Sequence, residues 1–203
     1  NPNHQQEWLW RSSFQYFHKK TKSKKLKKYL SELISSKDAV IKSLQKNYEY
    51  SYTKQKIRKL KKFKYIRIFG MGGSSLGGNA IYDFLKYKIK KKFVFSDNLQ
   101  VNLNKDKKKY TNLIVSKSGN TIETIVNANI FIKKKDRNIF ITENKDSYLF
   151  SLAEKLKSDI IHHNNYIGGR YSVLSEVGML PAELMGLKAN NFRQLNNLIK
   201  NKR

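Results

Sequence analysis

The sequence predicts an α/β fold, in which a mainly parallel sheet carries helices on both faces and follows a helical N-terminal segment. Two observations predict this fold. From residue 63 onward, short apolar runs alternate with longer stretches of helical pattern, and this alternation is typical of βαβ units with right-handed crossovers. Residues 1–62, by contrast, contain no glycine and show apolar residues at helical spacing.

The N-terminal segment is expected to be helical because Leu26, Leu30, Leu33 and Ile34 fall on one face of a helix. Its basic clusters, at 19–28 and 54–62, are expected to be solvated helix faces. An RNA-binding arm is the alternative interpretation. No repeat of fixed period and no Pro- or Ser-rich linker interrupts the chain.

The alternating region contains the strands and helices that we expect to form the sheet and its two covering layers. The apolar runs predict strands, and the stretches of helical spacing between them predict helices. The expected strands are 65–69, 93–95, 113–115, 138–141 and 160–162, and the expected helices are 79–87, 122–132 and 148–156. In such a sheet, ligands bind outside the carboxyl ends of the strands, so the loops after these strands are the candidate functional segments.

Composition is that of a globular protein. The 203 residues are 39% hydrophobic and 12% aromatic, which is enough apolar surface for a core. No apolar run approaches the roughly 18 residues that span a bilayer, and residues 1–6 do not have the order of a secretory signal. The absence of cysteine excludes disulfides and thiolate chemistry. We therefore expect a cytoplasmic protein that does not associate with a membrane.

The net charge of +27 raises nucleic acid as a possible partner. The excess is almost entirely lysine and is spread along the chain, with abundant asparagine and isoleucine, as an AT-rich coding sequence would produce. Nucleic-acid binding is therefore not the function that we expect. A field of this sign also attracts small phosphorylated metabolites.

The first candidate loop, "GMGGSSLGG" at 70–78, follows the first predicted strand. Glycines allow a tight turn with N–H groups directed at a ligand, and the helix that follows adds partial positive charge. The loop is not a P-loop, because Asn79 and Ala80 follow the last glycine where Lys and Ser/Thr would be required. A dinucleotide-binding loop would need a third glycine where Ser75 stands, although Asp97 could contact a ribose. On its own, this loop fits a structural turn as well as a phosphate site.

The second candidate loop, "SKSGNT" at 116–121, joins a predicted strand to a predicted helix. Asn120 and Glu123 have the spacing of a capping box, which would account for those two residues without a ligand. Capping does not require the neighbouring hydroxyl groups or the lysine. Gathered at one helix start, these groups predict a phosphate cradle.

The third candidate segment, "GGRYSVLSEVGMLP" at 168–181, places Arg170 after two glycines that permit close approach to a ligand. A planar guanidinium suits an oxyanion, and a surface salt bridge is the alternative. His162 and His163 precede this segment and are expected to be strand-end residues rather than a metal pair.

Taken together, the three segments resemble the glucose-6-phosphate isomerase family, which is built on sugar-isomerase (SIS) domains. They occur in the family's order, and the resemblance covers residues 63–187. It implies a flavodoxin-like three-layer sandwich of SIS type. It also implies the reversible isomerisation of glucose 6-phosphate and fructose 6-phosphate, in glycolysis and gluconeogenesis, through a cis-enediolate and without metal or organic cofactor.

The resemblance also assigns roles to residues of this chain. Arg170 would stabilise the enediolate, and Glu123 would support the site by orienting its neighbours. Gly73 and Ser74 would lie near the substrate. The phosphate-binding loop would consist of Ser116, Lys117, Ser118, Gly119, Asn120 and Thr121.

One departure from the family pattern is important: this sequence contains no Glu-Ser-Asn-Gly-Lys segment, in which the family carries its catalytic base, and no match to the later histidine and lysine. We therefore expect an N-terminal segment at 1–62, a sugar-phosphate-binding SIS domain at 63–187 and the start of a linking helix at 188–203, with the chain truncated. The complete protein is expected to be a homodimer, and the isolated chain inactive. The alternatives are a sugar-phosphate-binding regulator, an aminosugar-phosphate enzyme or, less favoured, a nucleic-acid-binding protein.

Overall fold

The computed structural model describes residues 24–99 and 108–193. By compactness the chain divides into two units, 1–36 and 37–203. The described part of the first unit is one helix, α2 (Lys24–Ser35), which confirms the helix predicted there. An exposed Lys28–Glu32 pair, with 3.8 Å between Nζ and Oε1, spans one turn of it.

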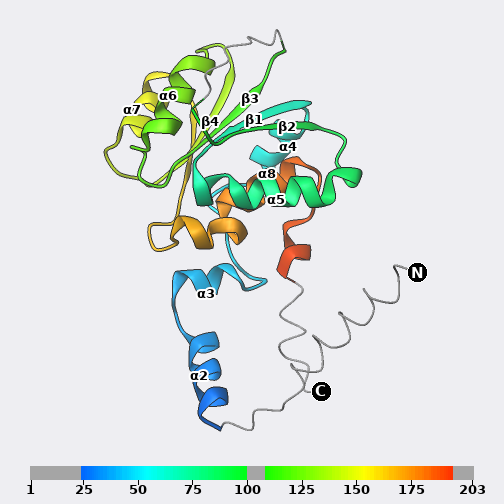
Figure 1. Cartoon of the computed structure of the whole chain (residues 1–203), viewed down its shortest axis with the longest axis vertical. Helices are drawn as coiled ribbons and strands as arrows, with labels where there is room; N and C mark the ends of the chain where they lie inside the picture. Colours follow the sequence, from blue (N-terminus) through cyan, green and yellow to red (C-terminus); the bar gives the residue numbers. More distant parts are fainter. Residues whose placement is uncertain (1–23, 100–107, 194–203) are drawn as a thin grey trace, which may run out of the picture. The chain divides into compact units, whose positions relative to one another are not determined.

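The second unit is built on a five-stranded parallel sheet (Figure 1). Its strand order, β2-β1-β3-β4-β5, is that of flavodoxin-like folds. The sheet confirms the predicted fold class, and all five carboxyl ends lie at one edge because every pairing is parallel. The strands are β1 (Tyr65–Phe69), β2 (Lys92–Ser96), β3 (Thr111–Val115), β4 (Arg137–Thr142) and β5 (Asp159–His162).

Helices cover both faces of the sheet, because successive strand residues point to opposite sides. Ile66 and Ile68 of β1 pack toward α4 (Lys54–Lys61), α5 (Leu76–Leu85) and α8 (Glu176–Leu184). Phe69 packs toward α6 (Ile122–Phe131) and α7 (Tyr148–Lys155) on the other side (Figure 1). The result is a three-layer sandwich with a core on each side of the sheet.

The central strands are apolar on both faces, as parallel strands covered on both sides require. Ile139, Phe140 and Ile141 of β4 are all fully buried. Each such side chain contributes about 1.5–3 kcal/mol to stability by leaving water. This is why the short apolar runs predicted the strands correctly.

Short elements complete the second unit. Asp38 caps α3 (Ala39–Ser43) by accepting hydrogen bonds from the N–H groups of Val40 and Ile41, at 2.8 and 3.3 Å. The 3-10 turns are η1 (Gly72–Ser74), η2 (Lys86–Lys88), η3 (Gly169–Leu174) and η4 (Ala189–Arg193). Buried Arg193 donates to the carbonyls of Ser43 and Leu174 and therefore ties η4 to α3 and η3.

Some predicted boundaries differ from those observed. The helix expected at 79–87 begins earlier, at Leu76, because Gly77 and Gly78 lie inside its first turn rather than in the loop. The basic cluster at 54–62 is a solvated face of α4, as expected, with Ile57 and Leu60 buried on the opposite side. Residues 194–203, which include most of the expected linking helix, lie outside the described residues, as do residues 19–23 of the first basic cluster. The domain division at 62 and 187 stays a prediction.

Within 24–99 and 108–193, no helix is both long and apolar enough to cross a membrane.

Candidate functional site

The glycine loop after β1 and the arginine loop after β5 are in main-chain contact. A Cβ atom on Gly73 would lie 2.3 Å from the carbonyl carbon and oxygen of Gly169. The hydroxyl of Ser172 donates to the carbonyl of Gly169 at 2.6 Å and lies 3.3 Å from that of Gly73. Only a glycine at position 73 therefore allows the two loops to come this close.

The glycine loop also lies beside the end of β3, where the loop 116–121 begins. A Cβ atom on Gly70 would lie 3.1 Å from Cβ of Ser74 and 3.2 Å from the carbonyl oxygen of Val115. All three segments singled out from the sequence thus gather at one edge of the sheet. This is the position that parallel strand ends predict.

The loop 116–121 is held in shape by its own hydroxyl groups. The Ser116 and Thr121 hydroxyls lie 2.9 Å apart, and Ser116 Oγ accepts a hydrogen bond from the N–H of Gly119 at 3.2 Å. Gly119 has φ of +69°, and a Cβ atom there would lie 2.1 Å from the Ser147 hydroxyl. Ser116 is buried, whereas Ser118 is exposed and Thr121 half-buried. The last two are therefore the hydroxyl groups open to a ligand.

The capping box, which was the alternative explanation for Asn120 and Glu123, is not formed. Thr121 is the N-cap of α6, and no side chain caps that helix. The carboxamide oxygen of Asn120 instead accepts from the N–H of Tyr148, at 2.9 Å, and the N–H of Asn120 donates to the Ser118 hydroxyl. Because the chain turns at Gly119, Asn120 reaches an unsatisfied donor at the start of α7 rather than at its own helix.

Helices α6 and α5 both begin at this edge without a side-chain cap. The first follows Thr121, and the second follows Ser75, whose hydroxyl contacts the carbonyl of Gly72. First-turn N–H groups have no intrahelical acceptor, and a helix N-terminus carries about half a positive charge. Such a start binds anions. The absence of a capping box thus leaves donors available for a phosphate.

Lys117 is held between two further strand-end loops. Its ammonium group donates to the carbonyl of Asn165, at 2.6 Å, and lies 3.4 Å from the carboxylate of Glu143. Lys145 pairs with the other oxygen of that carboxylate, at 2.7 Å. Burial opposes ionisation of Glu143, but the ammonium groups of Lys145 and Lys117 outweigh it and lower its pKa below the ordinary value. With one carboxylate between two ammonium groups, the cluster keeps a net positive charge.

Arg170 is exposed, and no carboxylate within the described ranges forms an ion pair with it. The alternative of a surface salt bridge is therefore not what the structure shows. A hollow of about 740 Å³ passes Gly73 and Arg170 and continues along the apolar side of α5, at Leu76 and Phe84. Its lining does not include the loop 116–121, so the two groups of candidate residues border different parts of the edge.

The two histidines have different environments. His162 is exposed at the end of β5, and His163 is buried, with its Nδ1 atom 3.0 Å from the carbonyl of Asn164. Burial lowers the pKa of His163, since the charged imidazolium would lose hydration. Both are strand-end residues, as predicted. Among the described residues, no group of three or more histidine and acidic side chains is arranged to hold a metal ion.

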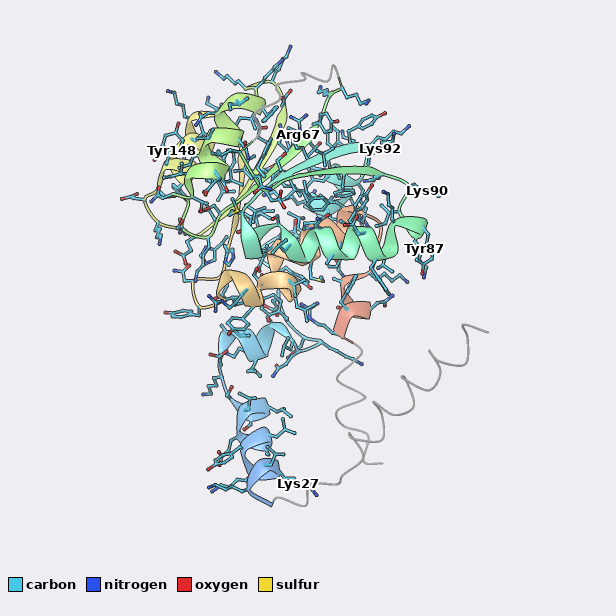
Figure 2. The ribbon with its side chains drawn as sticks, in the orientation of Figure 1. Lys27, Arg67, Tyr87, Lys90, Lys92 and Tyr148 are labelled. Carbon is cyan, nitrogen blue, oxygen red and sulfur yellow. The ribbon has the colours of Figure 1, made fainter. Side chains whose placement is uncertain are left out.

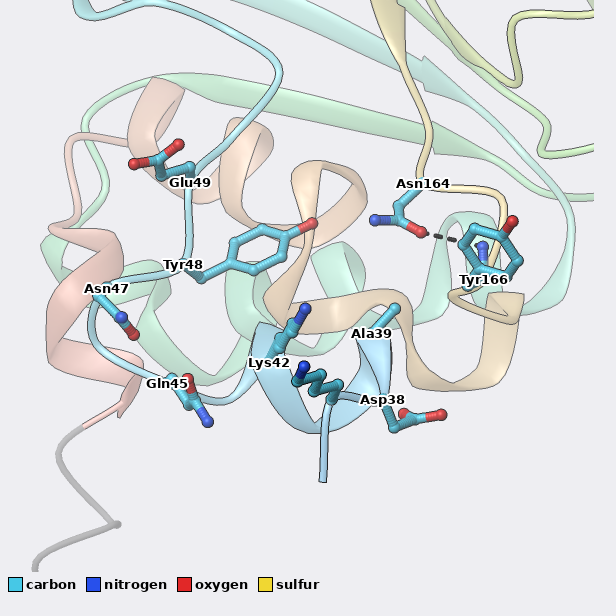
Figure 3. A pocket seen from close by; sticks show the side chains of 10 residues that line it. Asp38, Ala39, Lys42, Gln45, Asn47, Tyr48, Glu49, Asn164 and Tyr166 are labelled. Carbon is cyan, nitrogen blue, oxygen red and sulfur yellow. Dashed lines mark hydrogen bonds between the residues drawn. The ribbon is translucent and has the colours of Figure 1, made fainter. Parts of the chain in front are cut away.

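Another hollow, of about 610 Å³, lies where α3 meets the loop after β5 (Figure 3). Lys42 and Tyr48 line it on one side, and Asn164 and Tyr166 on the other (Figure 3). The Asn164 side chain accepts from the N–H of Tyr166, at 2.9 Å. This hollow includes none of the predicted site residues.

Sequence reasoning missed two residues of this edge, Glu143 and Ser172. Glu143 directly follows β4, so the rule that strand ends carry function could have identified it. Ser172 lies inside the third motif, but its contact with Gly73 joins positions 99 residues apart, and no local pattern predicts that.

Comparison with known proteins identifies the family. The model of the phosphoglucose isomerase family matches residues 27–198. Glucose-6-phosphate isomerases from Acholeplasma laidlawii and Mycoplasmopsis synoviae are each 32% identical to this chain, over 166 and 175 residues; the matches cover 68% and 73% of this chain. They cover 39% and 40% of those proteins, so the chain spans well under half their length. A solved structure of a hypothetical protein from Thermus thermophilus shares the fold, with a TM-score of 0.62, 22% identity and coverage of 81% of this chain and 43% of that one. The chain belongs to the phosphoglucose isomerase family.

Proposed function

We propose that the gathered loops bind glucose 6-phosphate or fructose 6-phosphate, and that the whole protein is a glucose-6-phosphate isomerase. The observation that carries this proposal is the pair of uncapped helix starts at one edge, beside open hydroxyl groups and an exposed guanidinium. The relatives named above are glucose-6-phosphate isomerases, and this supports the choice of substrate.

The phosphate group is assigned to the start of α6. Ser118 and Thr121 would donate their hydroxyl protons, and the first-turn N–H groups of the helix would donate beside them. Lys117 supplies positive charge close by, and Ser116, Gly119 and Asn120 set the shape of the loop. Hydrogen bonds to a charged group contribute roughly 1.5–3 kcal/mol each, so a few suffice for millimolar to micromolar binding.

The reacting end of the sugar is assigned to the glycine and arginine loops. Isomerisation removes a proton from C2 and returns one to C1, and negative charge develops on an enediolate oxygen between the two steps. Arg170, beside Gly73 and Ser74, would stabilise that charge. Glu123, in the first turn of α6, would support the site by orienting its neighbours rather than by moving the proton.

A base for the proton transfer is not among these residues. The family segment that carries it, Glu-Ser-Asn-Gly-Lys, does not occur in this sequence. The 203-residue chain is therefore proposed to bind the sugar phosphate without turning it over, and the complete enzyme to work as a homodimer.

Calorimetric titration of the chain with glucose 6-phosphate tests the binding step. Glucose, which has no phosphate, is expected not to bind detectably. Replacing both open hydroxyl groups, Ser118→Ala with Thr121→Val, is expected to weaken binding at least about tenfold, since the loss of one charge-assisted bond has that effect. The matched control is Ser151→Ala, an exposed serine on α7, which should leave the affinity unchanged. Equal binding by the double variant and the control would refute the assignment of the phosphate loop.

A test of the role of Arg170 requires a ligand that carries negative charge at the position where the enediolate would carry it. A phosphorylated sugar acid has a carboxylate at that end of the molecule. Arg170→Met should weaken its binding more than that of glucose 6-phosphate, because differential binding of the charged species marks a group that stabilises the transition state. Measurable isomerisation by the unaltered chain would contradict the proposal that the base lies elsewhere.

A further inference from the structure

A row of polar side chains crosses the sheet near the starts of its strands. Arg67 of β1 is in register with Asn112 of β3, and Asn112 with Asn138 of β4. Residues in register on parallel strands point to the same face. That face is the one on which α6 and α7 pack, because the next residues along it are Phe69 and Ile114. Apolar side chains would ordinarily fill these positions.

The two amides of this row leave one acceptor without a partner. The Asn112 side chain donates to the carboxamide oxygen of Asn138 at 2.8 Å, and Asn138 donates to the carbonyl of Lys133 at 2.9 Å. Within the described ranges, the carboxamide oxygen of Asn112 then has no hydrogen-bond partner, although the residue is only 1% exposed. Buried acceptors are rarely left unpaired in folded proteins.

Arg67, next in the row and labelled in Figure 2, is oriented by aromatic rings rather than by a carboxylate. Its guanidinium carbon lies 4.1 Å from the centre of the Tyr110 ring and 5.0 Å from that of Phe131. No described aspartate or glutamate forms an ion pair with it. Ring stacking occupies the faces of a guanidinium and leaves the N–H groups at its edge to bind an anion.

Arg67 and Asn112 line a pocket of about 370 Å³, within the size range of small-molecule sites. Among the described residues of its lining, Asp136 is the only acidic one, and one of its oxygens already accepts from the N–H of Lys133. The basic residues of the lining are Arg67, Lys108, Lys109, Lys133 and Lys135. A concave pocket with this charge balance favours a multiply charged anion.

The pocket is separate from the sugar-phosphate loops. Asn112 lies near the start of β3, and Ser116 follows its end; four residues of strand place them about 13 Å apart. Lys133 and Lys135 precede β4, at the opposite edge of the sheet from the candidate site.

We propose that this pocket is a second anion site, for a small molecule that carries two or more phosphoryl groups. Arg67 binds phosphoryl oxygens through its N–H edge, Lys133 and Lys135 neutralise the remaining charge, and Asn112 accepts a hydrogen bond from a donor on the ligand. Inorganic polyphosphate and a nucleoside polyphosphate share the phosphoryl chemistry, and only the nucleotide carries amino and hydroxyl donors for Asn112. A nucleic acid strand fits less well, because the charges converge on one hollow instead of following a groove.

The test is calorimetric titration of the full chain with tripolyphosphate and, separately, with ATP, without divalent metal, at about 0.15 M salt and with glucose 6-phosphate saturating. One saturable site is expected for at least one of the two ligands. If ATP binds more tightly than tripolyphosphate, the ligand is a nucleotide. If the two bind equally, the phosphate chain alone is recognised. Absence of saturable binding for both would overturn the proposal.

Matched variants separate the pocket from the general positive field. Arg67→Met should weaken binding at least about tenfold, and Arg58→Met, an exposed arginine on α4, by less than about twofold. If Arg67→Met fails to fold, the exposed pair Lys133→Ala with Lys135→Ala provides the same test. Its control is Lys90→Ala with Lys92→Ala, two exposed lysines at the β2 side of the sheet (Figure 2). Equal losses of affinity in the pocket and control variants would overturn the proposal. It would also be overturned if a short RNA strand displaced both ligands and bound the Lys133→Ala, Lys135→Ala variant as tightly as the unaltered chain.

Discussion

The contact between Gly73 and Gly169 makes a sharp prediction about Gly73→Ala. The new Cβ atom would lie 2.3 Å from the carbonyl group of Gly169 and 2.8 Å from the N–H of Arg170. Carbon atoms in ordinary contact are about 3.5 Å apart, so the two main-chain segments must separate by about 1 Å. Main-chain atoms cannot rotate away as a side chain can. We therefore expect a loss of about 1–3 kcal/mol in the free energy of unfolding, as for other overpacked sites.

The same displacement should affect ligand binding. Separation of the loops moves Arg170 relative to the glycine loop, and a misplacement of about 1 Å can cost a large factor where groups must converge on one ligand. Glucose 6-phosphate is expected to bind at least about tenfold more weakly to Gly73→Ala. Urea unfolding measures the stability, and calorimetric titration of the folded variant measures the affinity.

Gly169→Ala is the matched control, because it adds the same methyl group to the other side of the same contact. The nearest atom to its Cβ would be the Cα of Gly73, at 4.0 Å, so no displacement is required. We expect stability and affinity close to those of the unaltered chain. Equal effects of the two substitutions, or no effect of Gly73→Ala, would refute the claim that the two loops meet at the main chain.

Three further predictions concern the loops around the site. Asn120→Ala should lower the free energy of unfolding by about 0.5–2 kcal/mol, because the N–H of Tyr148 loses its acceptor. Thermal unfolding measures this against the control Asn144→Ala, which changes an exposed asparagine, and equal stability of the two variants would contradict it. Glu143 has a lowered pKa, so its ion pairs stabilise the fold above pH about 4.5, and this contribution is lost as the pH falls through the lower folded pKa. Glu143→Gln should remove this dependence of stability on pH, which urea unfolding across the acid range measures. His163 also has a lowered pKa, so below pH about 6.5 the unfolded chain takes up a proton that the folded chain does not, and the free energy of unfolding decreases as the pH falls. If this free energy depends on pH as steeply in His163→Gln as in the unaltered chain, the prediction is contradicted.

The sequence predicted the strands well, because burial on both faces leaves a plain apolar run. Ile139, Phe140 and Ile141 are an example. The strand ends were missed by one or two residues where polar residues join the ladder, as Thr111 and Arg137 do. Their side chains carry no apolar signal, but their main-chain groups pair with the neighbouring strand.

The position of the candidate site was also predictable, since parallel strands bring their following loops to one edge. The use of individual side chains was not. Asn120 has the spacing of a cap for α6, but its partner is Tyr148, 28 residues later and on another helix. Lys117 is held by Glu143 and Asn165, from two other strand-end loops, and no local spacing links them.

The polar row on the sheet is another feature that the sequence alone did not reveal. Arg67, Asn112 and Asn138 belong to three strands and become neighbours only through the register of the sheet. Arg67 interrupts the apolar run of β1, whereas Asn112 and Asn138 stand just before the apolar runs of β3 and β4. Only the pairing of the strands shows that the three polar residues align.

The central claim is that a sugar phosphate binds where the loops after β1, β3 and β5 meet, and amide chemical-shift mapping tests it most directly. Titration of the isotopically labelled chain with glucose 6-phosphate should shift the N–H signals at 70–76 and 117–124 most strongly, and Arg170 with them. Signals near Arg67 and Asn112, at the opposite edge of the sheet, should stay in place. Shifts centred on those two residues, or no saturable shift at the start of α6, would contradict the account.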